Sequence, residues 1–159
     1  MADEKMARAQ TVYKTLCAAL DDNEWHYKKD PEKLRIDCSA QGEDLPIEFS
    51  VVVDAGRQLI ILLSRLPFVI PEDKRLDVAI AVSVVNDEMV DGSFDYDVTN
   101  GQMYFRLTSS FIESEISKEL IFYMVICSCQ TIDNYNDKFL MLGKGLIGID
   151  KFIESETKN

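Results

Sequence analysis

His26 is the only histidine of the 159-residue chain, and histidine is the side chain best suited to acid–base catalysis and metal binding near neutral pH. It lies between Trp25 and Tyr27, where apolar and polar residues alternate. Acid–base and metal sites need several partners that converge on such a residue. We therefore interpret His26 as a structural or exposed side chain and predict no catalytic residue there.

Four cysteines could bind a metal or form disulfides: Cys17, Cys38, Cys127 and Cys129. Nothing in the sequence indicates an oxidising compartment. Cys127 and Cys129 lie inside a helical pattern, and residues two apart on a helix do not face each other. We expect four small, buried thiols rather than a metal clip or a redox pair.

An acidic stretch at positions 87–97 has a partial calcium-loop pattern. Asp91-x-Ser93-x-Asp95 imitates the first ligands of an EF-hand loop. The glycine stands second rather than sixth, however, and Gln102 occupies the twelfth place, where a glutamate is needed. We interpret the stretch as a solvated face and predict no metal site.

Phosphate-binding and nucleophile motifs are also missing. Gly143-Lys144-Gly145 lacks the spacing and the following Ser or Thr of a Walker loop. No serine in a nucleophile elbow and no Cys–His arrangement has a supporting context. We predict a non-enzymatic protein without a cofactor, and an enzyme of unrecognised type stays as an alternative.

Composition points to one globular domain over residues 1–159. Hydrophobic residues make up 47%, and 17 basic against 28 acidic residues give a net charge of −11. So acidic a chain repels phosphate backbones and anionic membrane surfaces, which argues against nucleic acid or membrane as partners. The N-terminus has no secretory signal pattern, and the longest apolar run, 120–127, is far too short to span a bilayer. We expect a soluble, cytoplasmic protein.

Hydrophobic periodicity predicts the elements that position these residues. An apolar stripe from Met6 to Leu20 indicates a helix, and period-two alternation indicates four strands between Trp25 and Leu63. After these strands the sequence predicts a helix over 72–89, a hairpin around Asn100-Gly101, a long helix over 114–142 and a short last helix. The order α-β-β-β-β-α-β-β-α-α, with hairpin-joined strands, predicts a largely antiparallel α+β fold.

Two hairpins are expected to have short turns that set their registers. Asn100-Gly101 predicts a two-residue type I′ turn. Tyr96 would then lie opposite Phe105, and Asp95 opposite Arg106. In the earlier hairpin, a turn at Ala55-Gly56 would place Asp54 opposite Arg57.

The second register leaves apolar residues on both sheet faces. Phe49, Val51, Ile60 and Leu62 would face the core, and the opposite face would carry Val52, Leu59, Ile61 and Leu63. Monomers seldom leave such a patch bare. Either a helix of the same chain covers it, or it is a dimer or partner surface.

The helix over 72–89 has the same ambiguity. Leu76, Ala79, Ile80 and Val84 form one apolar stripe, and further apolar residues surround the rest, so we expect the helix to be buried on more than one side. The spare side then carries Val78, Val82 and Val85, which become further candidates for a dimer surface.

The order of elements and several short motifs resemble the YbjN family, bacterial proteins labelled as candidate regulators of sensory transduction. The matching residues are Val51-Val52-Val53-Asp54, Leu66-Pro67-Phe68-Val69-Ile70-Pro71, Asn86, Gly92-Ser93-Phe94-Asp95, Gly101-Gln102-Met103-Tyr104-Phe105-Arg106 and Ile132-Asp133. The resemblance as a whole covers roughly residues 7–155. The resemblance implies a fold like that of type III secretion chaperones, which are small acidic proteins, usually dimers, that hold a partly unfolded partner segment. The second helix of those chaperones lies at their dimer contact.

These observations favour a protein-interaction or chaperone-like regulatory module. It would act as a homodimer or hold a protein partner through the apolar sheet face, and the acidic rim would steer basic partner segments. The alternative is a ligand-sensing regulator with a pocket between the sheet and the long helix.

Overall fold

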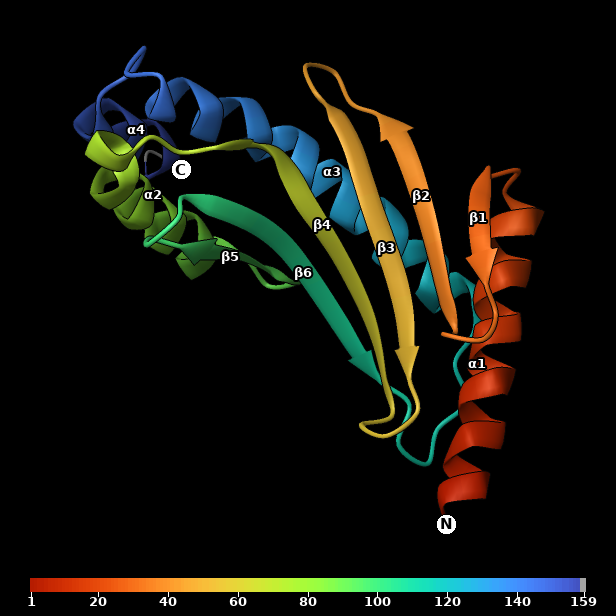
Figure 1. Cartoon of the computed structure of the whole chain (residues 1–159). Helices are drawn as coiled ribbons and strands as arrows, with labels where there is room; N and C mark the ends of the chain where they lie inside the picture. The colour runs from red at the N-terminus through yellow and green to blue at the C-terminus, as the bar shows by residue number, and fades with distance from the viewer. Residues whose placement is uncertain (158–159) are drawn as a thin grey trace.

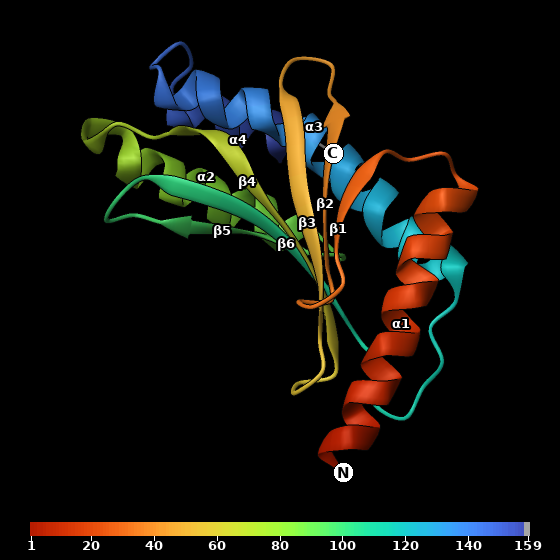
Figure 2. The ribbon, with the colours of Figure 1, turned by 45° about the vertical axis from the view of Figure 1, so that its right-hand side comes forward.

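The computed structural model describes residues 1–157, which form one six-stranded antiparallel sheet and four α-helices. The strand order is β1-β2-β3-β4-β6-β5. All four helices lie on one side of the sheet (Figures 1 and 2). The elements are α1 (Ala2–Asp22), β1 (Tyr27–Asp30), β2 (Arg35–Gln41), β3 (Pro46–Asp54), β4 (Leu59–Val69), a 3-10 turn (Glu72–Lys74), α2 (Arg75–Glu88), β5 (Ser93–Asp97), β6 (Gln102–Ser110), α3 (Lys118–Gly143) and α4 (Ile149–Glu156).

This architecture confirms the predicted α+β class and the predicted order of elements. The long helix begins four residues later than expected, because Ser117 caps it: the Ser117 Oγ accepts a hydrogen bond from the Leu120 N–H at 3.1 Å. It ends with Gly143, and Gly145, at φ +70°, follows its C-cap Lys144 in a left-handed conformation.

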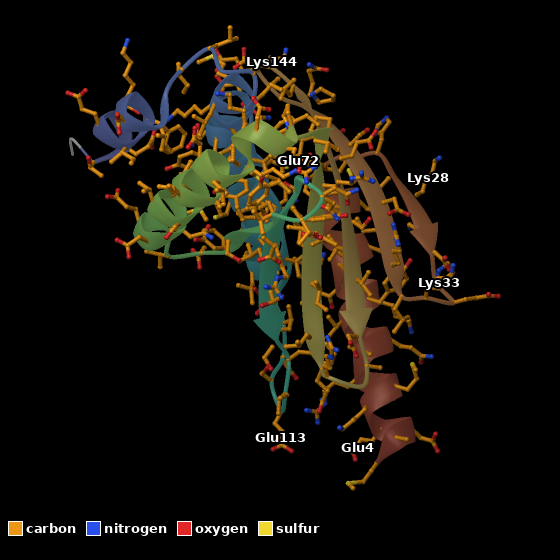
Figure 3. The ribbon with its side chains drawn as sticks, turned by 60° about the vertical axis from the view of Figure 1, so that its left-hand side comes forward. Glu4, Lys28, Lys33, Glu72, Glu113 and Lys144 are labelled. Atoms are coloured by element: carbon orange, nitrogen blue, oxygen red, sulfur yellow. The ribbon has the colours of Figure 1, made fainter. Side chains whose placement is uncertain are left out.

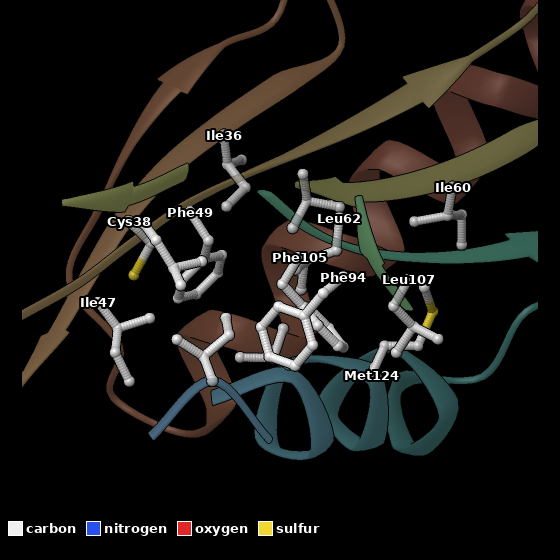
Figure 4. Close-up of a cluster of buried hydrophobic side chains, with 14 of the residues drawn as sticks. Ile36, Cys38, Ile47, Phe49, Ile60, Leu62, Phe94, Phe105, Leu107 and Met124 are labelled. Atoms are coloured by element: carbon white, nitrogen blue, oxygen red, sulfur yellow. The ribbon is translucent and has the colours of Figure 1, made fainter. Parts of the chain in front are cut away.

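The core lies between the sheet and α3. Inward-facing side chains of β2, β3, β4 and β6 meet Met124 of α3 in the cluster of Figure 4. Phe94 of β5 makes edge-to-face contacts with Phe105 and Phe139, whose ring centroids lie 5.3 and 5.1 Å away. Such contacts add to the free energy of burial. Helices α1, α2 and α3 pack on the inner face, and α4 packs on α2 and α3. No described helix covers the outer face.

Both predicted hairpin registers are wrong by two residues. Asp54 lies opposite Leu59 rather than Arg57, so the β3–β4 turn has four residues. Its geometry comes from the Asp54 Oδ1, which accepts from the Arg57 N–H at 2.9 Å, and from Gln58, which adopts a positive φ of 55°. The hydrogen bond from the backbone to the Asp54 side chain stabilises this four-residue turn and so favours it over the two-residue turn that was predicted.

The β5–β6 hairpin deviates in the same way. Tyr96 lies opposite Met103, and four residues after Asp97 form the loop. The Asp97 Oδ1 accepts from the N–H and Oγ1–H of Thr99, and the Gly101 N–H donates to the Asp97 carbonyl at 2.7 Å. Because a shift of two residues keeps each side chain on its face, the predicted faces are retained.

The predicted faces of α2 are reversed. Val78, Val82 and Val85 are 0%, 7% and 1% exposed, whereas Leu76 and Ile80 are 74% and 48% exposed. The helix packs on β5, α3 and α4 with its valine side inward. Both sides of α2 are apolar, so its sequence alone could not show which side packs. The three valines belong to the core, and their proposed role in a dimer surface is wrong.

Candidate functional site: the outer face of the sheet

The outer face carries an apolar strip along its two central strands. Val52 of β3 lies directly opposite Ile61 of β4, and Leu59 and Leu63 lie two residues to either side. Leu63 is 40% exposed, and the other three side chains are half-buried. We call these four residues the apolar strip. They lie together on one face, as predicted, and no described helix of the chain covers them.

A groove adjoins the strip at its Leu63 end. It has a volume of about 1000 Å³ and is lined by residues of β1, β2, β3, β4 and β6. Leu63 belongs to both features, whereas Val52, Leu59 and Ile61 lie outside the groove. No residue of α3 lines the groove, so it is not the predicted pocket between the sheet and the long helix. The polar members of its lining are His26, Tyr27, Lys28, Arg35, Asp37, Ser39, Glu48, Ser50, Arg65 and Tyr104. Its exposed apolar members are Pro46, Leu63, Pro67 and Val69.

One ion pair is built into the groove wall. The Asp37 Oδ1 accepts hydrogen bonds from the Arg35 Nη2 at 2.6 Å and from the Ser50 Oγ at 2.6 Å, and the same Nη2 lies 2.9 Å from the Ser50 Oγ. These bonds hold the pKa of Asp37 below its ordinary value, with Arg35 as the first cause. Asp37 is therefore ionised near neutral pH.

Two other cations line the groove. Arg65 is exposed and forms no ion pair within residues 1–157. Lys28 is also exposed, and it lies directly opposite Asp37 in the β1–β2 ladder, where its charge helps to lower the pKa of Asp37. The lining contains three basic and two acidic residues, whereas the chain as a whole contains 17 and 28. The groove is thus slightly basic in a strongly acidic protein, and it presents two cations to a ligand.

The residues considered for chemistry do not converge. His26 is exposed, and its Nδ1 lies 3.3 Å from the Glu24 carbonyl. Asp91 accepts from the Tyr123 hydroxyl, and Asp95 pairs with Arg106 at 2.8 Å across the hairpin. In the described part of the chain, no three His, Cys, Asp or Glu side chains gather as a metal ion would need.

The four cysteines are free thiols. Cys38 is buried, and the other three are half-buried, so the expectation of buried thiols is met only in part. Burial raises the pKa of Cys129 to about 12, with a smaller contribution from Cys38. A thiol with so high a pKa is a poor nucleophile and metal ligand at neutral pH.

The groove was not foreseen from the sequence, because it depends on where the pairing of β3 and β4 stops. The one local signal was Pro67, inside a run that otherwise alternates as a strand. Proline cannot donate to a sheet ladder and indicates an edge or a bulge. β4 has a register shift between Arg65 and Val69, on either side of this proline.

Comparison with known proteins gives a likeness of fold. No family model matches the sequence, and no curated protein matches it. Among solved structures, the chain is similar to the crystal structure of YbjN from E. coli, described there as a candidate transcription regulator. The match has a TM-score of 0.56 and 13% sequence identity, and it covers 77% of this chain and 86% of that one. None of the helices within residues 1–157 has the length and apolar character needed to cross a membrane. The chain thus has a YbjN-like α+β fold, as its sequence motifs indicated.

Proposed function

We propose that the protein is a non-enzymatic regulatory module that acts as a homodimer through the apolar strip. The observation that carries this proposal is the uncovered outer face, where four aliphatic side chains of β3 and β4 lie together in water. Two sheets can pack face to face about 10 Å apart with their apolar side chains interdigitated. A second copy of the chain supplies such a face.

The surface area supports this assignment. The chain exposes 9258 Å², whereas a compact monomer of its 18.1 kDa mass exposes about 8,100 Å². The difference exceeds the roughly 800 Å² that each partner of a standard interface buries. It has two visible sources: the uncovered sheet face and the first turns of α1, which project beyond the sheet (Figure 2).

The sheet edges favour face-to-face rather than edge-to-edge association. At the β5 edge, the Asn86 side chain donates to the Phe94 carbonyl and accepts from the Phe94 N–H, both at 2.9 Å. At the other edge, β1 has four residues and carries Lys28 and Lys29, with Lys28 projecting from the rim of the sheet in Figure 3. Short, lysine-bearing or covered edges resist pairing with another chain.

Charge favours regulation through proteins rather than through DNA. YbjN is described as a candidate transcription regulator. A chain with a net charge of −11 is repelled by phosphate backbones. If this protein shares a regulatory role, we propose that it binds other proteins in the cytoplasm and leaves DNA contact to them.

Substitutions in the strip test the proposal. Ile61→Asp places a charge in the interface twice, once per subunit, and the loss of two buried aliphatic side chains weakens association about 100-fold or more. Leu63→Asp, at a more exposed position, is the second variant. Leu76→Asp is the matched control, because Leu76 is exposed on α2, outside the strip.

We expect both strip variants to be folded monomers by circular dichroism and sedimentation, and the control to remain a dimer. An Ile61→Asp variant that unfolds, together with a Leu63→Asp variant that still dimerises, would place the strip in the monomer core and refute the proposal. A control that is monomeric while the strip variants dimerise would move the interface to α2.

A further inference from the structure

The central strands of the sheet separate at the groove. β3 and β4 pair from Asp54 opposite Leu59 up to Phe49 opposite Ser64, and no pairing joins them beyond that point. β3 continues back to Pro46 beside β2, and β4 continues to Val69 beside β6. Figure 1 shows the two ribbons diverging here, with α3 behind them. We call the segments Pro46–Glu48 and Arg65–Val69 the two arms of the fork.

The sequence explains why pairing stops. The buried Ser64 hydroxyl donates to the Glu48 carbonyl at 2.7 Å and so takes the place of the next backbone rung. Past it, Pro67 has no N–H, and the register shift between Arg65 and Val69 disrupts the β4 ladder. The backbones of the two arms therefore face each other across the fork without a strand partner.

Helix α3 fixes how far the arms stand apart. At the end of the β3 arm, the Glu43 N–H donates to the Asp133 Oδ1 at 2.8 Å. At the end of the β4 arm, Ile70 packs on Gly143, where a Cβ would lie 2.7 Å from its Cδ1. Ten helical residues separate these two contacts, or about 15 Å along the axis. Paired strands lie about 4.8 Å apart, and a strand inserted between two others needs about 9.6 Å. The two arms thus start one strand spacing apart at the Phe49–Ser64 rung and diverge toward anchors, just before β3 and just after β4, that lie about 15 Å apart along α3. A segment that enters from the open end meets two unpaired backbones.

The chemistry of the fork defines the segment that fits. Arg65 on the β4 arm is an exposed cation without an ion pair, and Lys28 across the groove is an exposed cation beside Asp37. Val69, 52% exposed, offers an apolar contact. Glu48 is the acidic residue on the arms. A strand that lies in the fork would present alternate side chains to this surface, and carboxylates in those positions would meet Arg65 and Lys28.

We propose that the fork between β3 and β4 binds an extended, acidic segment of a partner protein, which pairs with the arms as an additional strand. This site adjoins the apolar strip at Leu63, and the two arms themselves lie outside the strip. A protein with a dimeric strip and an occupied fork would couple its own assembly to a second protein. The partner segment differs from the basic one expected from overall charge, because the lining of the groove is locally basic.

Model peptides test the proposal on the full chain. The probes are three fluorescent octapeptides: alternating Val and Asp, alternating Val and Lys, and alternating Pro and Asp. We expect the Val–Asp peptide to bind with a Kd below about 1 mM. The Val–Lys peptide has the wrong charge, and the Pro–Asp peptide lacks half the backbone donors, so both should bind at least fivefold more weakly. Amide exchange should slow in the two arms when the Val–Asp peptide is bound.

Variants locate the binding. Arg65→Glu and Lys28→Glu should each weaken the Val–Asp peptide about fivefold or more, since charge reversal replaces an attraction worth up to about 1 kcal/mol by repulsion. Lys151→Glu, the same change at an exposed residue of α4, should leave the affinity unchanged. The Ile61→Asp variant should retain binding whether or not it dimerises, so that this test stands apart from that of the dimer. Absence of binding at 1 mM, equal binding of the three peptides, or slowed exchange outside the arms would overturn the proposal.

Discussion

Asn86 is predicted to stabilise the fold by closing the β5 edge. Its amide makes two hydrogen bonds of 2.9 Å to the Phe94 backbone. Each contributes about 1 kcal/mol, and Asn86→Ala removes both. Alanine is the better helix former by roughly 0.5 kcal/mol, so the free energy of unfolding should fall by about 1.5 kcal/mol. For a chain of this size the melting temperature should drop by roughly 3–6 °C.

Urea unfolding followed by circular dichroism measures this change. Ser83→Ala is the matched control, because Ser83 is an exposed polar residue of the same helix, and its stability should be unchanged or slightly raised. The variant without Asn86 should also aggregate at lower concentration, since its edge strand has lost its cover. A change in unfolding free energy below 0.5 kcal/mol for Asn86→Ala would refute the role assigned to this side chain.

Three further predictions follow from individual contacts. Gly101→Ala should lower the free energy of unfolding by about 2 kcal/mol or more, because Gly101 has φ +77° and an added Cβ would lie 2.2 Å from the Ile70 carbonyl oxygen. Urea unfolding measures this change, and an unchanged unfolding midpoint would contradict that geometry. Since the pKa of Asp37 is lowered in the folded state, its stabilisation is present above the unfolded pKa of about 3.9 and is lost as pH falls through the folded value. The difference in unfolding free energy between the wild type and Asp37→Asn should therefore shrink below pH 4. A difference that grows there would mean that ionised Asp37 does not stabilise the folded state. Burial raises the pKa of Cys129 to about 12. Iodoacetamide at pH 8 should therefore alkylate Cys129 far more slowly in the native protein than in urea, as mass spectrometry of the peptide that contains it can show. Equal rates would mean that the thiol is accessible in the native protein.

The sequence predicted the faces of the sheet better than its registers. Alternation placed Val52 and Ile61 on one face, and both hairpin errors were of two residues, which leave the face unchanged. The errors arose because Asp54 and Asp97 bond the backbone of the turn and favour four-residue loops. Such side-chain bonds are not visible in hydrophobic periodicity.

Features that depend on packing between distant parts of the chain could not be predicted from the sequence. The valine side of α2 faces inward because β5, α3 and α4 meet it there, although its other side is also apolar. Asn86 was part of a family-like motif, but its bonds to Phe94 require the helix and the edge strand to be adjacent. The fork depends on the contacts of Asp133 with the loop before β3 and of Gly143 with Ile70 after β4.

The solution mass of the purified protein tests the central claim most directly. Light scattering over a concentration series compares it with the monomer mass of 18.1 kDa. We expect a stable mass of twice that value for the wild type and a monomer for Ile61→Asp at every concentration. A wild-type protein that stays monomeric throughout the series would contradict the assignment of the apolar strip as a dimer interface.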